Sequence, residues 1–303
     1  AQTRDGRDLA IKVQYPGVAA SIDSDVANVG GLMRISGLLP RGLEIAPLLD
    51  EARKQLHEEA DYARERAMLA RFGELVGGDP DYRVPAPCPA LSTGAVLAMD
   101  FVPGVPIEDG AQLSQDQRDR IMTRLADLFL REVFEFRLIQ SDPNFANYRL
   151  DPETGQIILL DFGAARPVPD GIAAGYRRLL AAGFEGDDDA LRAAALDLGF
   201  FAPDTAKHHA ALVLGMVGTV FAALRVGDTF DFADTALTDR MRAQGIALAA
   251  ERDFAHVPPI DTLFLQRKVA GLFLLGARLG ARVPLRRLIA DRLGPLADHC
   301  PGG

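Results

Sequence analysis

The stretch Ser141–Gly163, SDPNFANYRLDPETGQIILLDFG, predicts a β-hairpin with polar side chains at its open end. Asn147–Leu150 and Ile157–Leu160 are its two short strands, and the segment between them has Pro early and Gly late, as a turn does. Asp142 precedes the first strand, and Asp161 directly follows the second. Because the two strands of a hairpin pair in antiparallel fashion, both aspartates should converge with the first residue of the first strand.

This order of side chains is the one that protein kinases use for phosphoryl transfer. One Asp meets the attacking hydroxyl, while an Asn after four intervening residues and a later Asp hold Mg²⁺. Asp142, Asn147 and Asp161 occupy those three places. A surface hairpin with solvated acids is the alternative, because D-F-G alone is a common match. The complete pattern of D-x-x-x-x-N, hairpin and D-F-G favours the kinase-like interpretation.

Length and composition set the frame for this interpretation. A chain of 303 residues can form two lobes around a cleft, and 48% hydrophobic residues exclude wholesale disorder. A net charge of −9 gives no general attraction to nucleic acid or anionic lipid. Cys88 and Cys300 form no disulfide framework, which favours a reducing compartment. No run of 18 uncharged apolar residues exists, so we expect no transmembrane helix. Since the chain does not begin with Met, we expect it to be truncated at its start.

Lys12 stands in a predicted strand, Leu9–Gln14, that resembles the V-A-I-K strand of protein kinases. In kinases this lysine contacts the α- and β-phosphates of ATP and pairs with a helix carboxylate. A lysine that faces water from an edge strand is the alternative for this segment alone.

The carboxylate partner is expected on a long helical pattern over Glu44–Val76. Spacing does not choose among four acidic residues, and a solvated helix face is the alternative for each of them. The four candidates are Glu58, Glu59, Asp61 and Glu65.

The adenine base is expected at a hinge that follows a buried strand, Gly94–Met99. A backbone amide and a carbonyl of this segment could pair with the edge of the base, although any strand-to-loop exit has a similar sequence. The hinge candidates are Met99, Asp100, Phe101 and Val102.

The remainder of the chain predicts helices. Ala19–Leu39 is an expected helical insertion, and Ser114 with Gln117 forms a capping box that begins a helix running to about Phe136. Six further helices are expected at about 171–182, 187–198, 203–226, 238–251, 260–279 and 284–293.

The histidines show no metal-ligand spacing, and the pair His208-His209 is most simply a pair on a helix surface. No Ser-His-Asp or Cys-His arrangement supports acyl transfer. The five histidines are His57, His208, His209, His256 and His299.

Taken together, these segments resemble the UbiB/ADCK (AarF-domain) atypical kinase-like family, in the branch tied to coenzyme Q biosynthesis. The resemblance extends over nearly the whole chain. It rests on AIKVQYPGV at 10–18, EADYARE at 59–65, QSDPNFAN at 140–147, LDFGAAR at 160–166 and QRKVAG at 266–271.

The resemblance implies a role for each site residue. Lys12 becomes the phosphate-contacting lysine and Glu65 its ion-pair partner. Asp142 becomes the catalytic-loop aspartate, while Asn147 and Asp161 become the metal ligands. The cofactors implied are ATP and Mg²⁺.

The resemblance also implies regulation. Glu59 and Asp61 match the family's E-x-D motif, which is placed on the same helix as Glu65 and faces a lysine of an N-terminal K-x-G-Q helix. That helix and an Ala-rich loop would both lie before residue 1. No A-P-E follows Asp161, so a platform for protein substrates is not expected.

The fold implied is an α+β, protein-kinase-like two-lobe fold. Residues 1–102 form a small β-containing N-lobe, incomplete at its start and carrying helical insertions. Residues 103–303 form a mostly helical C-lobe with the catalytic hairpin.

The function implied is a Mg²⁺-dependent ATPase or a small-molecule or lipid kinase that supports ubiquinone (coenzyme Q) biosynthesis. Its partners would be ATP and a quinone-pathway lipid or lipid-biosynthesis enzymes, with no nucleic acid. It would act in the cytoplasm or peripherally on the inner membrane of a bacterium with a GC-rich genome. Two alternatives stay open: a nucleotide-gated, non-catalytic scaffold and a phosphotransferase of the aminoglycoside or choline type.

Overall fold

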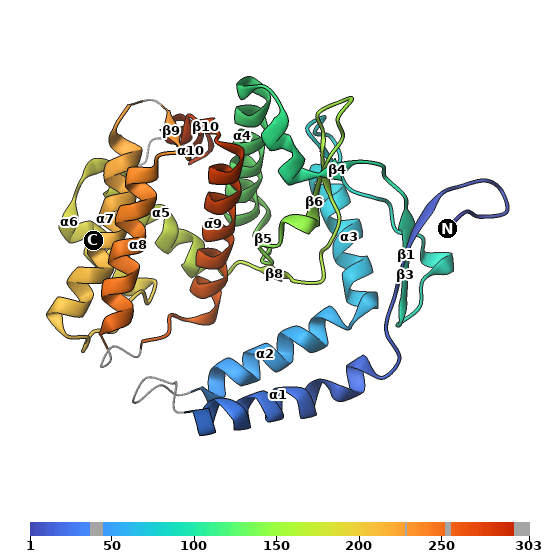
Figure 1. Ribbon diagram of the computed structural model, residues 1–303, viewed down its shortest axis with the longest axis horizontal. Helices are drawn as coiled ribbons and strands as arrows, with labels where there is room; N and C mark the ends of the chain where they lie inside the picture. The colour runs from blue at the N-terminus through green and yellow to red at the C-terminus, as the bar shows by residue number, and fades with distance from the viewer. Residues whose placement is uncertain (37–44, 228, 252–255, 294–303) are drawn as a thin grey trace. The chain divides into compact units, whose positions relative to one another are not determined.

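The computed structural model describes residues 1–36, 45–227, 229–251 and 256–293 (Figure 1). The described residues divide into two compact units. The first comprises residues 1–36, 45–110 and 140–166, so the predicted hairpin packs with the N-terminal segments. The second comprises residues 111–139 and those from 167 onward. The lobe boundary after residue 102 stays a prediction, because a grouping by internal packing does not locate a hinge.

Lys12 lies on a two-stranded antiparallel sheet in the first unit. Strand β1, Leu9–Val13, pairs with β3, Val96–Asp100, in a register that sets Lys12 opposite Leu97. Leu97 is fully buried, and Leu9 at the start of β1 is buried as well. Both strands were expected from their apolar runs, and their ends lie within one or two residues of the prediction.

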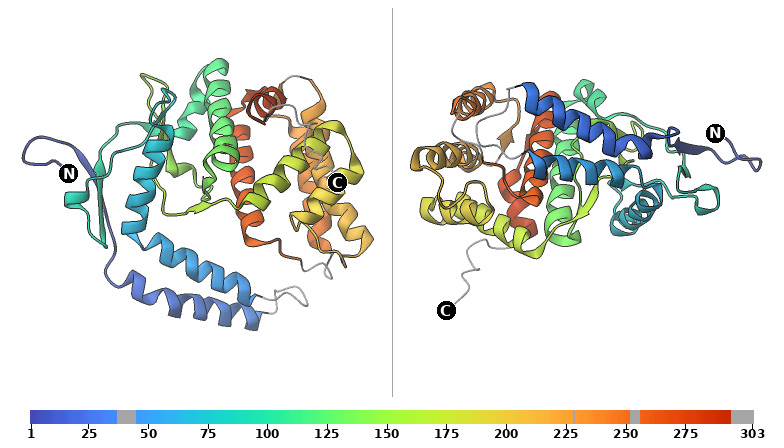
Figure 2. Two further views of the ribbon diagram at one scale, coloured as in Figure 1. Left: turned by 180° about the vertical axis from the view of Figure 1, so that it is seen from behind. Right: turned by 90° about the horizontal axis from the view of Figure 1, so that it is seen from below.

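Three helices accompany this sheet: α1, Val18–Ser36; α2, Ala46–Glu59; and α3, Tyr62–Val76. Helices α1 and α2 lie side by side (Figures 1 and 2). Gly30 lets them approach closely, since a Cβ atom there would lie 2.6 Å from a methyl carbon of Leu49. The expected helix over 19–39 corresponds to α1, with residues 37–39 outside the described part of the chain.

The prediction of one continuous helix over Glu44–Val76 is wrong. Helix α2 ends at Glu59, and Asp61 leaves the helical region with φ −91° and ψ 86°. The Asp61 carboxylate accepts a hydrogen bond from the Arg64 amide at 3.0 Å and so caps α3. Asp is among the best helix N-caps because it satisfies an amide that has no partner within the helix. Apolar periodicity continues across this break, which is why the pattern alone did not reveal it.

The hairpin belongs to a four-stranded sheet of order β2-β7-β6-β4. Strands β6 and β7 pair in antiparallel fashion with Tyr148 opposite Leu159, and β2 runs parallel to β7. The turn is held by Asp151, whose carboxylate accepts hydrogen bonds from the amides of Glu153 and Thr154. The strands are β2, Tyr82–Arg83; β4, Val105–Pro106; β6, Tyr148–Leu150; and β7, Ile157–Leu159.

In the second unit, helix α4, Gln115–Arg131, begins at the predicted capping box. The Ser114 hydroxyl accepts from the Gln117 amide, and the Gln117 side chain accepts from the Ser114 amide. A π-helical turn, Glu132–Phe136, continues α4 and ends at Arg137, which has a positive φ of 53°. The helix therefore reaches the end that the sequence predicted, with a wider last turn.

The six helices predicted after the hairpin are all present: α5, Asp170–Glu185; α6, Asp188–Asp197; α7, Lys207–Arg225; α8, Thr235–Ala250; α9, Ile260–Leu279; and α10, Leu285–Leu293. The short elements are β5, Leu138–Gln140; β8, Ala165–Pro167; β9, Phe230–Asp231; β10, Arg282–Val283; and the 3₁₀ turns Pro89–Leu91, Ile107–Gln112 and Phe145–Asn147.

A buried ion pair lies in the core of the second unit. The Lys268 ammonium on α9 lies 3.5 Å from the Glu132 carboxylate at the start of the π-helical turn, and both side chains are almost fully buried. Neighbouring apolar side chains form a cluster of Val133, Ile139, Val168, Ala173 and Leu265.

Among the described helices, α7 is long and apolar enough to cross a membrane when judged by length and composition alone. An 18-residue stretch of this helix has a mean hydropathy of 1.3, and 17% of that stretch is buried inside the protein. The sequence criterion of 18 uncharged apolar residues did not select it, because charged residues lie at both of its ends.

Candidate nucleotide and metal site

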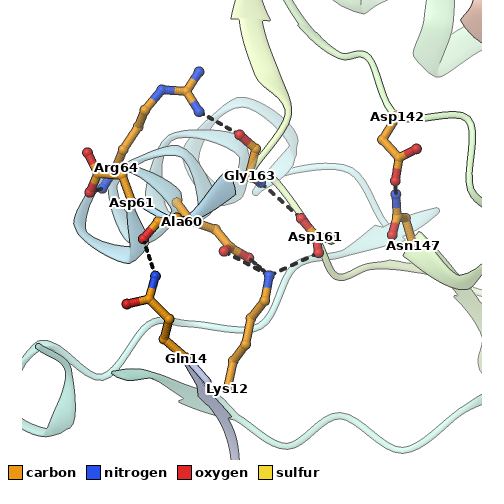
Figure 3. A network of polar contacts seen from close by, with 10 residues as sticks. Lys12, Gln14, Ala60, Asp61, Arg64, Asp142, Asn147, Asp161 and Gly163 are labelled. Carbon is orange, nitrogen blue, oxygen red and sulfur yellow. Dashed lines mark hydrogen bonds and ion pairs between the residues drawn. The ribbon is translucent and has the colours of Figure 1, made fainter. Parts of the chain in front are cut away.

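Lys12 and Glu65 form an ion pair between strand β1 and helix α3. The Lys12 ammonium lies 2.9 Å from both carboxylate oxygens of Glu65 and 3.1 Å from Oδ2 of Asp161 (Figure 3). The Glu65 side chain is 2% exposed, whereas that of Lys12 is 37% exposed. The ring of Tyr62 lies below the ammonium, 5.2 Å from it. Of the four carboxylates that spacing left open, the structure brings Glu65 to Lys12.

Burial and charge act against each other on this pair. Burial works to lower the pKa of Lys12, but the carboxylates of Asp161 and Glu65 outweigh it and the pKa is raised. For Glu65, burial and then the charge of Asp161 raise the pKa above its ordinary value, against the opposing effect of Lys12. The raised pKa of Lys12 means that its ammonium stays positively charged beside the carboxylates of Glu65 and Asp161.

The D-F-G segment is fixed by packing and by a backbone contact. Oδ1 of Asp161 accepts a hydrogen bond from the Gly163 amide at 2.9 Å. Phe162 is buried and stacks on Phe72 of α3, with ring centroids 4.4 Å apart. A Cβ atom at Gly163 would lie 3.3 Å from Oδ1 of Asp161 and 3.6 Å from a Glu65 oxygen. A side chain at position 163 would therefore press on the Asp161 carboxylate by a few tenths of an ångström, and glycine avoids that contact.

Asp142 and Asn147 point toward each other (Figure 3). The Asn147 amide nitrogen Nδ2 donates to Oδ2 of Asp142 at 2.8 Å, and the Asn144 backbone amide donates to Oδ1 at 3.3 Å. The Leu160 amide donates to the Asn147 carbonyl at 3.1 Å, which extends the hairpin ladder to the residue before Asp161. The hairpin therefore holds Asn147 next to the strand end that carries Asp161.

The donor atoms at this end of the hairpin fit a magnesium ion. Since Nδ2 of Asn147 donates to Asp142, the amide oxygen Oδ1 is left as the acceptor that can face a metal. The Asp161 oxygens each accept one hydrogen bond and keep further lone pairs. Amide and carboxylate oxygens are hard ligands of the kind that Mg²⁺ prefers.

Some of the hinge candidates already form backbone contacts within the protein. Met99 lies in the ladder opposite Ala10. The Asp100 amide donates to the Ala86 carbonyl at 2.9 Å, and the Phe101 amide donates to the Asp8 carbonyl at 3.0 Å. These two amides are therefore used within the protein, a detail that the apolar pattern of the strand did not contain.

The resemblance implied that the E-x-D residues share a helix with Glu65, and this expectation is wrong. Glu59 is the last residue of α2, and Asp61 caps α3. Between them, the Ala60 carbonyl accepts a hydrogen bond at 2.9 Å from the side chain of Gln14, which follows β1 (Figure 3). The motif therefore lies at the junction of two helices, close to the strand of Lys12.

Two arginines that the sequence analysis did not single out connect the D-F-G segment and the chain just after it to helices α2 and α3. The Arg64 guanidinium donates to the Gly163 carbonyl at 2.6 Å and to the Ala165 carbonyl (Figure 3). Arg64 lies within the family-like segment EADYARE, shortly after the E-x-D motif. This position is the signal from which the sequence could have indicated a role for Arg64.

Arg166, the second of these arginines, forms ion pairs with helix α2. Its guanidinium lies 3.2 Å from Glu51 and 3.4 Å from Glu58, both on α2. Glu58 also lies 3.8 Å from the guanidinium of Arg64. The two arginines thus link the chain after Asp161 to the helices on either side of the α2–α3 junction.

A strand lysine paired with a helix glutamate, a D-F-G aspartate at the same ammonium and an Asp–Asn pair on a hairpin define a protein of the kinase-like class. The model of the ABC1 atypical kinase-like domain matches residues 1–195, and the chain belongs to this family. The family resemblance inferred from the motifs is thereby confirmed.

Curated relatives agree with this assignment. The chain is 39% identical to "Atypical kinase COQ8B, mitochondrial" of Rattus norvegicus over 95% of this chain and 54% of that protein. It is 34% identical to "Atypical kinase COQ8, mitochondrial" of Saccharomyces cerevisiae over 96% and 58%. The chain spans about half the length of the curated relatives it matches.

A solved structure supports the fold. The Rv3197–erythromycin complex from Mycobacterium tuberculosis aligns with a TM-score of 0.74 and 22% identity, over 98% of this chain and 74% of that one. The α+β kinase-like fold predicted from the sequence is therefore confirmed.

Proposed function

We propose that this protein binds Mg²⁺–ATP and transfers the γ-phosphoryl group to water or to a small-molecule or lipid hydroxyl, in support of coenzyme Q biosynthesis. The observation that carries the proposal is the contact of Lys12 with both Glu65 and Asp161. It supports the proposal because a charged lysine held in this way is the phosphate-binding device of kinases.

Each residue has a proposed role. Lys12 neutralises charge on the phosphates, and Glu65 orients it. Asn147 and Asp161 would hold Mg²⁺, which supplies further neutralisation of phosphate charge when bound. Asp142 accepts a hydrogen bond from the attacking hydroxyl or water.

The adenine base is proposed to lie against the hinge, Met99–Val102. The amides of Asp100 and Phe101 donate within the protein. We therefore assign the base-contacting amide to Val102.

Regulation is proposed at Glu59 and Asp61, which would face a lysine of a K-x-G-Q segment. Their place at the α2–α3 junction supports this role, because a contact there would bear on Glu65 in the first turn of α3.

The proposed location is the bacterial cytoplasm, with peripheral contact to the inner membrane. The proposed partners are quinone-pathway lipids or lipid-biosynthesis enzymes.

A second candidate is a nucleotide-gated scaffold that performs no phosphoryl transfer. The observation in its favour is that both oxygens of Asp142 accept hydrogen bonds from its own loop, from Asn144 and Asn147. Such a carboxylate could serve to shape the loop alone.

Phosphate release by Asp142→Asn in the full-length protein separates the two candidates. We expect the substitution to keep Mg²⁺–ATP affinity within a few-fold and to lower phosphate release by about 10²- to 10⁴-fold, the usual worth of general acid–base catalysis. Glu153→Gln, which removes an exposed carboxylate from the turn of the same hairpin, is the matched control. Equal phosphate release by Asp142→Asn and the parent would favour the scaffold.

A further inference from the structure

Helices α7 and α8 lie side by side and run in opposite directions (Figures 1 and 2). A hydrogen bond of 3.0 Å from the Gln244 side chain to the Thr219 hydroxyl joins them. Because the helices are antiparallel, the beginning of α7 meets the end of α8. His208 and His209 occupy the first turn of α7, and Glu251 directly follows α8.

These three side chains converge on one point. Nε2 of His209 lies 3.2 Å from Oε2 of Glu251, and Nε2 of His208 lies 3.7 Å from the same oxygen. The two imidazole rings lie with their centroids 3.9 Å apart. One ligand atom from each of the three residues lies within 4.8 Å of the others.

The expectation that His208 and His209 form a pair on the helix surface is wrong for His209. Its side chain is 7% exposed, against 65% for His208 and 40% for Glu251. Sequence spacing did not indicate a site because the third residue lies 42 positions beyond His209. The cluster thus has one buried imidazole and two groups that remain open to solvent.

We propose that His208, His209 and Glu251 form a binding site for a divalent transition-metal ion of the zinc type. Two imidazoles and a carboxylate are a ligand set that such ions use when one coordination position stays open. Ligands at about 2.0–2.1 Å from a tetrahedral ion lie about 3.3 Å apart, close to the separations of both histidines from Glu251.

Charge does not oppose this assignment, and the exposure of the side chains suits it. The N-terminus of α7 disfavours a cation through the helix dipole, and the carboxylate of Glu251 offsets that effect. The exposed ring of His208 can turn to close the remaining distance, whereas the buried ring of His209 supplies a fixed ligand. A bound ion would tie α7 to α8. None of its three residues belongs to the proposed nucleotide site.

Calorimetric titration of Zn²⁺ into the full-length protein, without a histidine tag and in excess Mg²⁺, tests the proposal. Magnesium prefers oxygen ligands, so its excess masks the hairpin site and leaves this one available. We expect saturable binding of one Zn²⁺ at this cluster. Glu251→Gln and His208→Ala should each weaken it by at least about tenfold, since loss of a supporting contact alone costs about 10- to 100-fold. Co²⁺ in place of Zn²⁺ should give a visible absorption band that both substitutions reduce.

His57→Ala is the matched control, because His57 forms a single histidine–carboxylate pair with Asp23 at 3.1 Å. It should leave Zn²⁺ affinity unchanged. His208→Ala carries little risk to folding, since its side chain is largely exposed, and circular dichroism checks every variant. Absence of saturable Zn²⁺ binding, or affinity unaltered by both Glu251→Gln and His208→Ala, would overturn the site and leave a hydrogen-bonded His–Glu contact.

Discussion

At the scale of single residues, the surroundings of Glu65 disfavour the charged form of its carboxyl group. Burial and the charge of Asp161 raise its pKa, although it is paired with Lys12. A raised pKa means that the folded protein takes up a proton at higher pH than the unfolded chain does. The contribution of Glu65 to stability therefore increases as the pH falls from neutral through the raised pKa toward about 4.3, the ordinary value for Glu.

The direction of this pH dependence can be measured by comparing the parent with Glu65→Gln. The glutamine side chain of the variant takes up no proton in this pH range. We expect the free energy of unfolding of the parent to rise relative to that of the variant as the pH is lowered across this window. Denaturant titrations at several pH values provide the measurement. A fall instead of a rise would mean that the ion pair with Lys12 outweighs burial.

Asp161 carries the second prediction at this scale. Its carboxylate contacts Lys12 and the Gly163 amide and is a proposed metal ligand. Asp161→Asn should weaken Mg²⁺–ATP binding by about 10- to 100-fold, corresponding to loss of about 1.5–3 kcal/mol from interactions with a charged group. Glu153→Gln should bind like the parent in the same calorimetric titration. If Asp161→Asn also binds like the parent, Asp161 is not a ligand.

At the scale of secondary-structure elements, the α2–α3 junction and the chain after Asp161 are held together by arginines. Arg166 is mostly buried and contacts Glu51 and Glu58, whose side chains are themselves 17% and 23% exposed. Removing Arg166 would take away the guanidinium that compensates Glu51 and would leave Glu58 with the longer contact to Arg64, at 3.8 Å. We therefore expect the ion pairs of Arg166 to contribute to the stability of the protein and to the position of the D-F-G segment.

We expect Arg166→Ala to lower the free energy of unfolding by about 3 kcal/mol, at the lower end for a buried ion pair. Arg71→Ala is the control, because Arg71 forms an exposed pair with Glu74 one turn later on α3. Such pairs contribute about 0.3–0.5 kcal/mol. Denaturant unfolding of both variants gives the comparison, and losses of similar size would show that Arg166 has no special structural role.

At the scale of the whole molecule, the second unit contains a buried charge pair within an apolar core. Lys268 lies in the QRKVAG segment and contacts Glu132, with both side chains at most 3% exposed. Desolvation makes such a pair expensive, so it is weak evidence of net stabilisation. Breaking it, however, leaves a buried charge.

Lys268→Met should therefore cost about 3–5 kcal/mol, whereas the double variant Glu132→Gln with Lys268→Met should recover much of that loss. The double-mutant cycle, measured by denaturant unfolding, isolates the coupling between the two residues. Additive losses in the two single variants and the double variant would show that the pair is not coupled.

Local signals in the sequence were sufficient for much of this protein. The hairpin follows from two apolar runs and a turn, and α4 begins at a capping box that four consecutive residues contain. The six later helices follow from apolar periodicity. These features depend on neighbours in the chain, so a sequence pattern can predict them. Motif spacing likewise predicted Asp142, Asn147 and Asp161 as candidate site residues, whereas the choice of Lys12 needed the family resemblance as well.

Tertiary structure decided which distant groups meet. Four carboxylates suited Lys12 by spacing, and in the folded protein Glu65, in the first turn of α3 after the cap at Asp61, is the one that contacts the ammonium. The same holds for Glu251, which reaches His209 because α8 returns along α7. Such contacts form between residues far apart in the chain, and their choice depends on packing and burial. Periodicity and spacing do not record these quantities, because they describe only how each segment is ordered along itself.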